Sequence, residues 1–170
     1  ESLNFAALKK LPVLFICENN LYSVYSSLDA RQPKERSLKK LSSSIGVESI
    51  TVDENNVQKI YQLVKKYSNK VRNSGKPFLI EFMTYRYREH CGPNNDDNLG
   101  YRNKNEIKKW KNKDPIQVFE NFLLKNKKIT KYQIQKIENI IHKKIKNAFK
   151  FAEISKFPPK QNAYKNIFAE

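Results

Sequence analysis

The sequence predicts an α/β fold in which a parallel sheet flanked by helices is followed by a helical tail. Three short apolar runs lack the alternation of half-exposed strands, so they suit strands buried on both faces; they cover residues 13–17, 50–52 and 78–83. A helical pattern separates the second run from the third. This strand–helix–strand order with short connections favours a right-handed parallel crossover. From residue 104 onward the pattern is mainly helical.

The first part of the chain contains the three strands and the helices around them. Residues 1–10 suit the end of an amphipathic helix, with Lys9 and Lys10 in the last turn, where cations favour the helix dipole. Residues 26–46 are polar and serine-rich, which predicts a surface loop with a short helix over 34–41. Asp53 is expected to cap a helix over 55–74. The apolar face of that helix would carry Val57, Ile60, Tyr61, Val64 and Tyr67.

The second part begins after a loop over residues 91–103, which is rich in turn-forming Gly, Pro, Asn and Asp. Asp114-Pro115 is expected to open one helix, and Thr130 to cap a longer one. The apolar stripe of the longer helix consists of Ile134, Ile137, Ile141, Ile145, Ala148 and Ala152. Phe157-Pro158-Pro159 should end it and leave an extended tail. We therefore divide the chain into an α/β part over 1–103 and a helical extension over 104–170, which packs on that part or on partner subunits.

The net charge of +16 is unevenly distributed. Residues 1–100 hold 15 Lys/Arg against 11 Asp/Glu, and residues 101–170 hold 18 against 6. The basic residues are not interleaved with stacking aromatics, so we expect no nucleic-acid partner. No apolar run reaches the roughly 18–20 residues of a membrane helix, so we expect no membrane association. Two distant cysteines form no metal pattern and suit a reducing cytoplasm of bacterial type, with the mitochondrial matrix as the alternative.

Polar residues follow two of the predicted strands. Glu18-Asn19-Asn20 follows the first, and a segment running to His90 follows the third. If these strands are neighbours, both segments face one crevice, because ligands of open α/β sheets bind outside the carboxyl ends of the strands. Asparagine and backbone carbonyls are hard neutral donors that suit Mg²⁺, whereas an Asx-type turn is the alternative interpretation of Asn19-Asn20. The arginines beside His90 suit a phosphate group, and a surface histidine without a role is the alternative there.

Several stretches together resemble one family. They are residues 2–8, residues 11–22 with Cys17-Glu18-Asn19-Asn20-Leu21-Tyr22, Thr84-Tyr85-Arg86-Tyr87 with His90, Gly100-Tyr101-Arg102, and Trp110 with Asp114-Pro115-Ile116. In order and spacing they resemble the alpha subunit of the decarboxylating component of 2-oxo acid dehydrogenase complexes, whose members act on pyruvate, branched-chain 2-oxo acids or acetoin. The resemblance implies the C-terminal portion of a thiamine diphosphate-binding fold.

The same resemblance implies site residues and cofactors. Asn20 matches a Mg²⁺ ligand through its side chain, and Tyr22 matches a ligand through its backbone carbonyl. His90 matches a catalytic histidine on the loop over the diphosphate of thiamine diphosphate. The Gly-Asp-Gly half of the family's metal motif should lie before Glu1. Glu89 stands where many relatives have glycine, beside the expected diphosphate, and Cys91 stands where mammalian relatives carry a regulatory serine.

The implied activity is oxidative decarboxylation of a small 2-oxo acid, with pyruvate as the expected substrate and acyl transfer to a lipoyl group. The implied partners are the beta subunit, in a heterotetramer that completes the active site, and the lipoyl-bearing acyltransferase. Two alternatives remain open from the sequence. One is a related thiamine diphosphate enzyme with another substrate such as acetoin, and the other is a non-catalytic basic binding module.

Overall fold

A computed structural model describes residues 1–53, 55–165 and 167–168 of the chain. Its central element is a three-stranded parallel sheet in the order β1-β5-β4, built from β1 (Leu14–Asn19), β4 (Glu48–Val52) and β5 (Phe78–Met83). The predicted strands and their parallel pairing are therefore confirmed. The first and third predicted strands are direct neighbours, as the shared-crevice argument requires.

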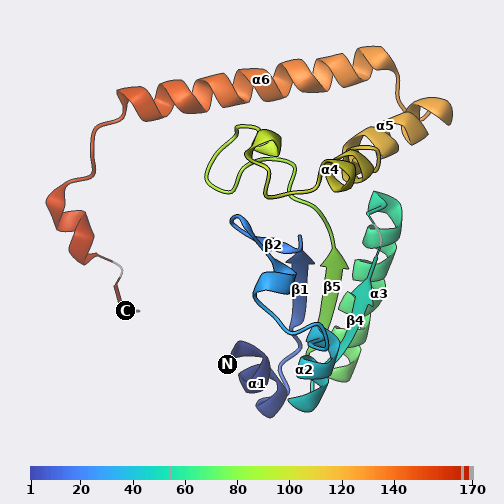
Figure 1. Cartoon of the computed structure of the whole chain (residues 1–170). Coiled ribbons are helices and arrows are strands. Elements are labelled where there is room, and N and C mark those ends of the chain that lie inside the picture. The colour runs from blue at the N-terminus through green and yellow to red at the C-terminus, as the bar shows by residue number, and fades with distance from the viewer. Residues whose placement is uncertain (54, 166, 169–170) are drawn as a thin grey trace. The chain divides into compact units, whose positions relative to one another are not determined.

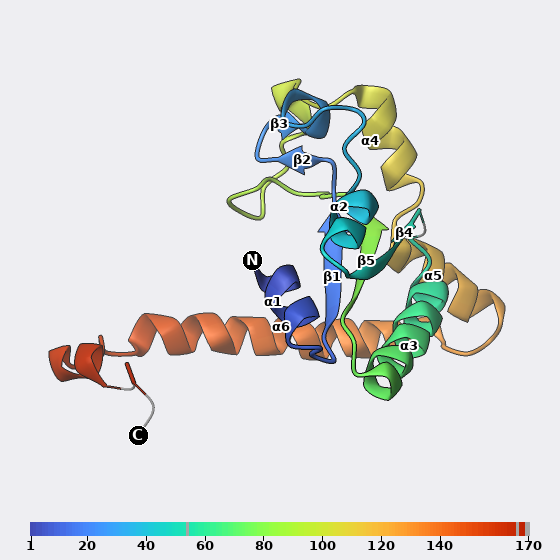
Figure 2. The same cartoon turned by 90° about the horizontal axis from the view of Figure 1, so that it is seen from below.

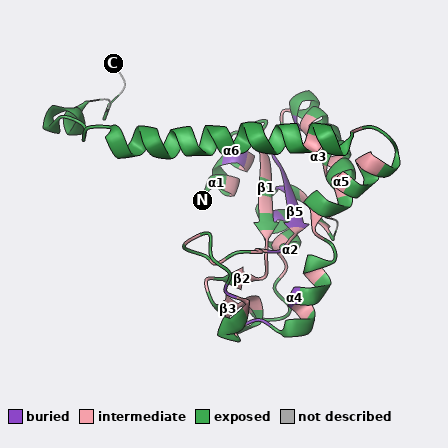
Figure 3. Ribbon diagram, turned by 90° about the horizontal axis from the view of Figure 1, so that it is seen from above, coloured by how far each residue is buried: buried purple, intermediate pink, exposed green. Residues whose placement is uncertain are grey.

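Helices lie on either side of the sheet. Figure 1 and Figure 2 both show the strands between α1 (Ser2–Leu8) and α3 (Val57–Ser74). Alternate residues of β5 point toward α3 and form the core with the buried Val71 of that helix. These strand residues are Phe78, Ile80 and Phe82. The central strand has no exposed face, so its sequence is apolar apart from Glu81. It is the buried strand in Figure 3.

Helix α3 differs from its prediction in two details. Its N-cap is Asn56, whose side-chain oxygen accepts from the backbone N–H groups of Gln58 and Lys59, so the prediction of Asp53 was wrong. On the predicted apolar face, Tyr61 is 67% and Val57 40% exposed, and neither belongs to the core cluster. The helix ends at Gly75, where φ of +65° is easily adopted by a residue without a side chain.

The segment between β1 and β4 is more ordered than predicted. It contains a two-stranded hairpin of β2 (Tyr22–Ser23) and β3 (Ser26–Ser27), then η1 (Leu28–Ala30) and α2 (Leu38–Ser44). The expected helix over 34–41 therefore lies several residues later, because Ser37 is the N-cap that accepts from the N–H of Lys40.

The remaining elements follow β5. They are η2 (Asp97–Leu99), α4 (Lys104–Lys111), α5 (Pro115–Lys125), α6 (Lys131–Ile154) and η3 (Lys160–Tyr164). The predicted cap at Thr130 is confirmed as a capping box with Gln133. The short helix η3 replaces part of the extended tail expected there.

The chain divides into two compact units, Glu1–Asn121 and Phe122–Glu170. The first contains the sheet, the loop over residues 84–103 and α4. The second contains α6, which is exposed along its length (Figure 3). None of the helices among the described residues is long and apolar enough to cross a membrane.

Candidate functional site at the carboxyl ends of the strands

A cleft of about 520 Å³ opens at the carboxyl end of β1. Asn19, Asn20 and Tyr22 line it from the end of β1 and the segment that follows, and Glu81 and Met83 line it from β5. The far wall comes from the segment between η1 and α2 and includes Gln32, Arg36 and Ser37. In Figure 1 the strand arrowheads point toward the loop that follows β5, so the cleft lies where ligands of parallel α/β sheets bind.

A buried carboxylate joins the three strands at the floor of the cleft. Glu81 is only 7% exposed. One of its oxygens accepts from the Asn19 amide at 2.8 Å, and the other accepts from the Thr51 hydroxyl at 2.8 Å. Burial, followed by the negative charges of Glu81 and Glu18, raises the pKa of the Cys17 thiol. Glu81 was not among the residues predicted for the site, although one charge inside an apolar run was a signal for it.

Asn20 lies at the turn that leaves β1. Its side-chain oxygen accepts from the backbone N–H of Tyr22 at 2.9 Å, and the side-chain oxygen of Asn19 accepts from the N–H of Leu21 at 3.1 Å. Both asparagines therefore form Asx turns, as in the alternative interpretation of this pair. A carbonyl oxygen has two lone pairs, so the Asn20 oxygen retains acceptor capacity while it holds the turn.

Tyr22 follows, and its side chain is partly buried. Its hydroxyl donates to Glu106 in the first turn of α4 at 2.9 Å, and its ring packs edge-on against Tyr101 with centroids 5.7 Å apart. Burial, followed by the hydrogen bond to Glu106, raises the pKa of Tyr22 to about 12. The phenol is therefore a neutral donor at physiological pH.

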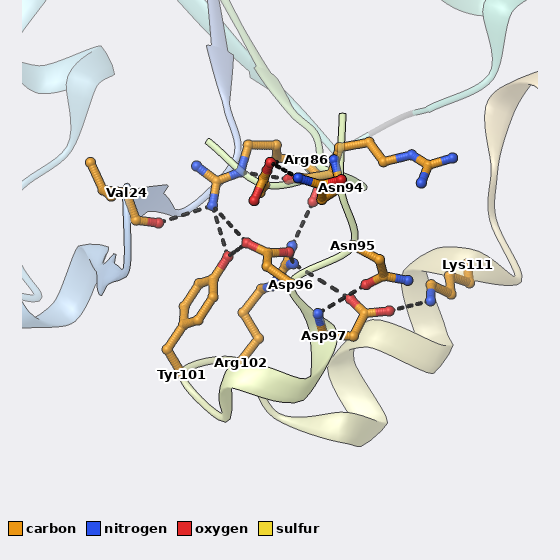
Figure 4. Close-up of polar contacts among 11 residues, drawn as sticks. Val24, Arg86, Asn94, Asn95, Asp96, Asp97, Tyr101, Arg102 and Lys111 are labelled. Atoms are coloured by element: carbon orange, nitrogen blue, oxygen red, sulfur yellow. Dashed lines mark hydrogen bonds and ion pairs between the residues drawn. The ribbon is translucent and has the colours of Figure 1, made fainter. Parts of the chain in front are cut away.

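The loop over residues 84–103 is organised around a buried ion pair between Arg102 and Asp96, which are 4% and 2% exposed. Arg102 also donates to the backbone oxygen of Arg86 at 2.6 Å. Asp96 accepts from the Tyr101 hydroxyl, which in turn accepts from Arg86 at 2.8 Å (Figure 4). Arg86 also donates to the backbone oxygen of Val24 at 2.9 Å. This network ties the loop to the hairpin that begins at Tyr22.

The tyrosines of Thr84-Tyr85-Arg86-Tyr87 are the members that face the interior, although the strand itself ends at Met83. Tyr85 is 5% exposed and stacks on Trp110 with ring centroids 5.4 Å apart. The Tyr87 hydroxyl donates to the backbone oxygen of Trp110 at 3.1 Å. The loop thus rests on α4, with the arginine side chains left for polar contacts.

His90 lies on the exposed part of the same loop and does not line the cleft. Its neighbour Glu89 binds Asn94, accepting from the side-chain amide at 2.8 Å and from the backbone N–H at 3.3 Å. A Cβ atom at Gly92 would lie 2.4 Å from a carboxylate oxygen of Glu89, so a larger residue there would displace that side chain. Glu89 therefore closes the turn that presents His90 and Cys91, both of which are exposed.

The donor set fits part of a magnesium site. Asn20 and Tyr22 both line the cleft and contribute neutral oxygens of the hard type that Mg²⁺ prefers. Within the described residues, no group of three or more His, Cys, Asp or Glu side chains could hold a metal by itself. A cation here would need further oxygens, such as those of a diphosphate.

Comparison with known proteins matches residues 1–161 to the dehydrogenase E1 component family. The pyruvate dehydrogenase E1 component subunit alpha of Rickettsia felis is 34% identical over 168 residues, which is 99% of this chain and 50% of that protein. The chloroplastic alpha-3 subunit of Arabidopsis thaliana is 31% identical over 170 residues, which is 100% of this chain and 39% of that protein.

A second kind of relative matches a shorter stretch. The 2-oxoisovalerate dehydrogenase subunit alpha of Bacillus subtilis is 34% identical over 123 residues, which is 72% of this chain and 36% of that protein. The chain spans about half the length of the curated relatives from Rickettsia that it matches. The resemblance seen in the sequence is therefore confirmed, and the chain belongs to the dehydrogenase E1 component family.

Proposed function

We propose that this chain is the C-terminal part of the alpha subunit of a thiamine diphosphate-dependent 2-oxo acid dehydrogenase, with pyruvate as its substrate. The observation that carries the proposal is the position of Asn20 and Tyr22. Both line one cleft at the carboxyl ends of parallel strands, in a chain that the family matches over residues 1–161. Relatives named as pyruvate dehydrogenase subunits cover nearly the whole chain, whereas the 2-oxoisovalerate relative covers 72% of it, which favours pyruvate.

The residues of this chain would hold and orient the cofactor. Asn20 would bind Mg²⁺ through its side-chain oxygen and Tyr22 through its backbone carbonyl, which would bring the diphosphate to the end of β1. His90 would contact the diphosphate from the exposed turn closed by Glu89 and Asn94. Within that turn the carboxylate of Glu89 accepts from the side-chain amide and the backbone N–H of Asn94. When bound, thiamine diphosphate supplies the decarboxylation chemistry, and the acyl group passes to a lipoyl group of the acyltransferase.

The partner subunits would complete the site and cover the helical extension. Asn20 and Tyr22 provide two neutral donors in the cleft, and we propose that the remaining ligands come from other segments of the alpha subunit and from the beta subunit. In α6, Ile137, Ile141 and Ile145 are each about half exposed, at 49%, 48% and 49%. A stripe of this kind on a 24-residue helix is typical of a face that packs against another surface. We therefore propose that residues 104–170 take part in heterotetramer contacts.

The proposal is tested by calorimetric titration of the full-length subunit, mixed with its beta partner, with thiamine diphosphate at several Mg²⁺ concentrations. We expect Mg²⁺-dependent binding that Asn20→Ala weakens by at least about tenfold, since even outer-shell partners of metals contribute that much. Asn56→Ala is the matched control, because the side-chain oxygen of Asn56 likewise accepts from the backbone N–H two residues later, that of Gln58 at 3.0 Å, but Asn56 does not line the cleft. Equal affinities of the Asn20→Ala variant and the unsubstituted protein would refute the ligand assignment.

A further inference from the structure

The segment that follows β1 contains two non-glycine residues in a strained backbone conformation. Leu21 and Val24 adopt φ of +66° and +56°, in the left-handed region that side chains disfavour. Val24 is β-branched, which makes this conformation especially unfavourable. Local bonds hold part of the segment, namely the Asx turn of Asn20 onto Tyr22 and the bond from the N–H of Leu28 to the oxygen of Leu21 at 2.7 Å. A segment strained in this way needs support from elsewhere in the fold.

Glu106, which is distant in the sequence, supplies such support. Its carboxylate accepts the Tyr22 hydroxyl at 2.9 Å across 84 positions of the chain. Glu106 lies in the first turn of α4, where a negative charge favours the helix dipole. Asn103 caps the same helix by accepting from the N–H of Asn105 at 2.8 Å. The acceptor therefore stands on a helix end whose position is well defined.

Helix α4 begins directly after the 84–103 loop and its buried network. Arg102 lies at the end of this loop and pairs with Asp96. Its guanidinium lies 5.0 Å from the centre of the Tyr101 ring, and Tyr22 packs against the same ring. The second carboxylate oxygen of Glu106 is buried without a hydrogen-bond partner among the described residues. Glu106 therefore stands just after the loop and accepts from Tyr22. This hydrogen bond joins the loop that carries His90 to the segment that carries Asn20.

We infer that Glu106 is a positioning residue, which holds the main chain of Tyr22 so that its carbonyl can bind a divalent cation. This inference rests on the proposed function, because it needs a cation at Asn20 and Tyr22. Glu106 itself touches neither metal nor substrate.

The test uses the full-length subunit assembled with its beta partner, and the probe is Mg²⁺ titrated at saturating thiamine diphosphate. We expect Glu106→Ala and Tyr22→Phe each to weaken Mg²⁺ affinity by about tenfold, the lower end for outer-shell partners of a metal. The double variant should be no weaker than the weaker single variant, because both changes remove the same hydrogen bond. Additive losses would mean that the two residues act separately, and would overturn the inference.

The variant Glu106→Gln distinguishes an effect of the hydrogen bond to Tyr22 on Mg²⁺ affinity from an effect of the negative charge. Glutamine keeps an oxygen that accepts from Tyr22 but has no charge, so Mg²⁺ affinity within about twofold of the unsubstituted protein is expected if position is what matters. A loss equal to that of Glu106→Ala would assign the effect to the electric field of the carboxylate and overturn the inference. Glu48→Ala is the control for loss of one negative charge, because Glu48 lies at the opposite end of the sheet in an exposed pair with Lys70.

Hydrogen exchange gives a readout that does not depend on the metal. Without cofactor, Glu106→Ala should speed exchange of the backbone amides over residues 20–24 and leave those of β4 unchanged. Faster exchange with unaltered Mg²⁺ affinity would overturn the positioning role and leave the proposed function intact. Absence of any Mg²⁺-dependent binding in the unsubstituted assembly would instead refute the proposed function and the inference with it.

Discussion

Removing the Arg102 guanidinium should open the loop over residues 84–103. Arg102→Met keeps much of the length of the side chain but leaves Asp96, which is 2% exposed, without its closest cation. Arg86 remains 3.8 Å from Asp96 and can compensate only in part. Leaving a buried charge without its partner costs about 3–5 kcal/mol. The variant also loses the bond to the Arg86 carbonyl and the contact of the cation with the Tyr85 ring.

This cost can be measured as local opening in the full-length protein. Since about 1.4 kcal/mol corresponds to a factor of ten, amide protection over the loop should fall by roughly two to three and a half orders of magnitude. Arg102→Lys keeps a charge but loses the fork of donors, so a smaller loss of about 1.5–3 kcal/mol is expected. Arg31→Met, at an exposed position, controls for the loss of one positive charge.

Two results would refute this reasoning. If Arg102→Met lowers loop protection by less than tenfold, the ion pair with Asp96 does not hold the loop. If Arg102→Lys is as damaging as Arg102→Met, the effect comes from the shape of the side chain rather than from the unpaired carboxylate. In either case the support that we assign to Glu106 through this loop would have to come from the packing of Tyr85 on Trp110 instead.

Two further predictions concern carboxylates. Glu81→Met should destabilise the full-length protein by about 1–3 kcal/mol in denaturant unfolding, because the partly buried amide of Asn19 would lose its acceptor; an unchanged midpoint would contradict this. Burial acts to raise the pKa of Asp97, but its ion pair with Lys111 outweighs burial and the pKa lies below its usual value of 3.8. An acid whose pKa is lower in the folded state than in the unfolded state stabilises the fold above the unfolded-state pKa, and this stabilisation is lost as the pH falls through the folded-state pKa. Asp97→Asn should therefore flatten the dependence of stability on pH below about pH 4. An unaltered pH dependence would exclude this contribution.

The strands and their order along the chain could be predicted from the sequence because their causes are local. Strands buried on both faces must be mainly apolar, so β5 stands out as Phe78–Met83 even though it contains Glu81. Gly75 ends α3, and Thr130 begins α6, for reasons of backbone geometry and capping that operate within a few residues. The choice between Asp53 and Asn56 as a cap was not determined in this way, since either residue type can cap a helix. The family was also visible in the sequence, because its motifs lie in short stretches.

Only the tertiary structure decided which distant residues meet. Parallel pairing of β1 with β5 brings Asn19 to Glu81, so a charge inside an apolar run becomes the floor of a cleft. Tyr22 and Glu106 are 84 positions apart, and no periodicity or spacing relates them. Such contacts depend on how whole elements pack, whereas caps, turns and apolar runs depend on neighbours in the chain. The sequence by itself therefore determined the strands and the residues proposed to bind Mg²⁺, and the fold decided what holds those residues in place.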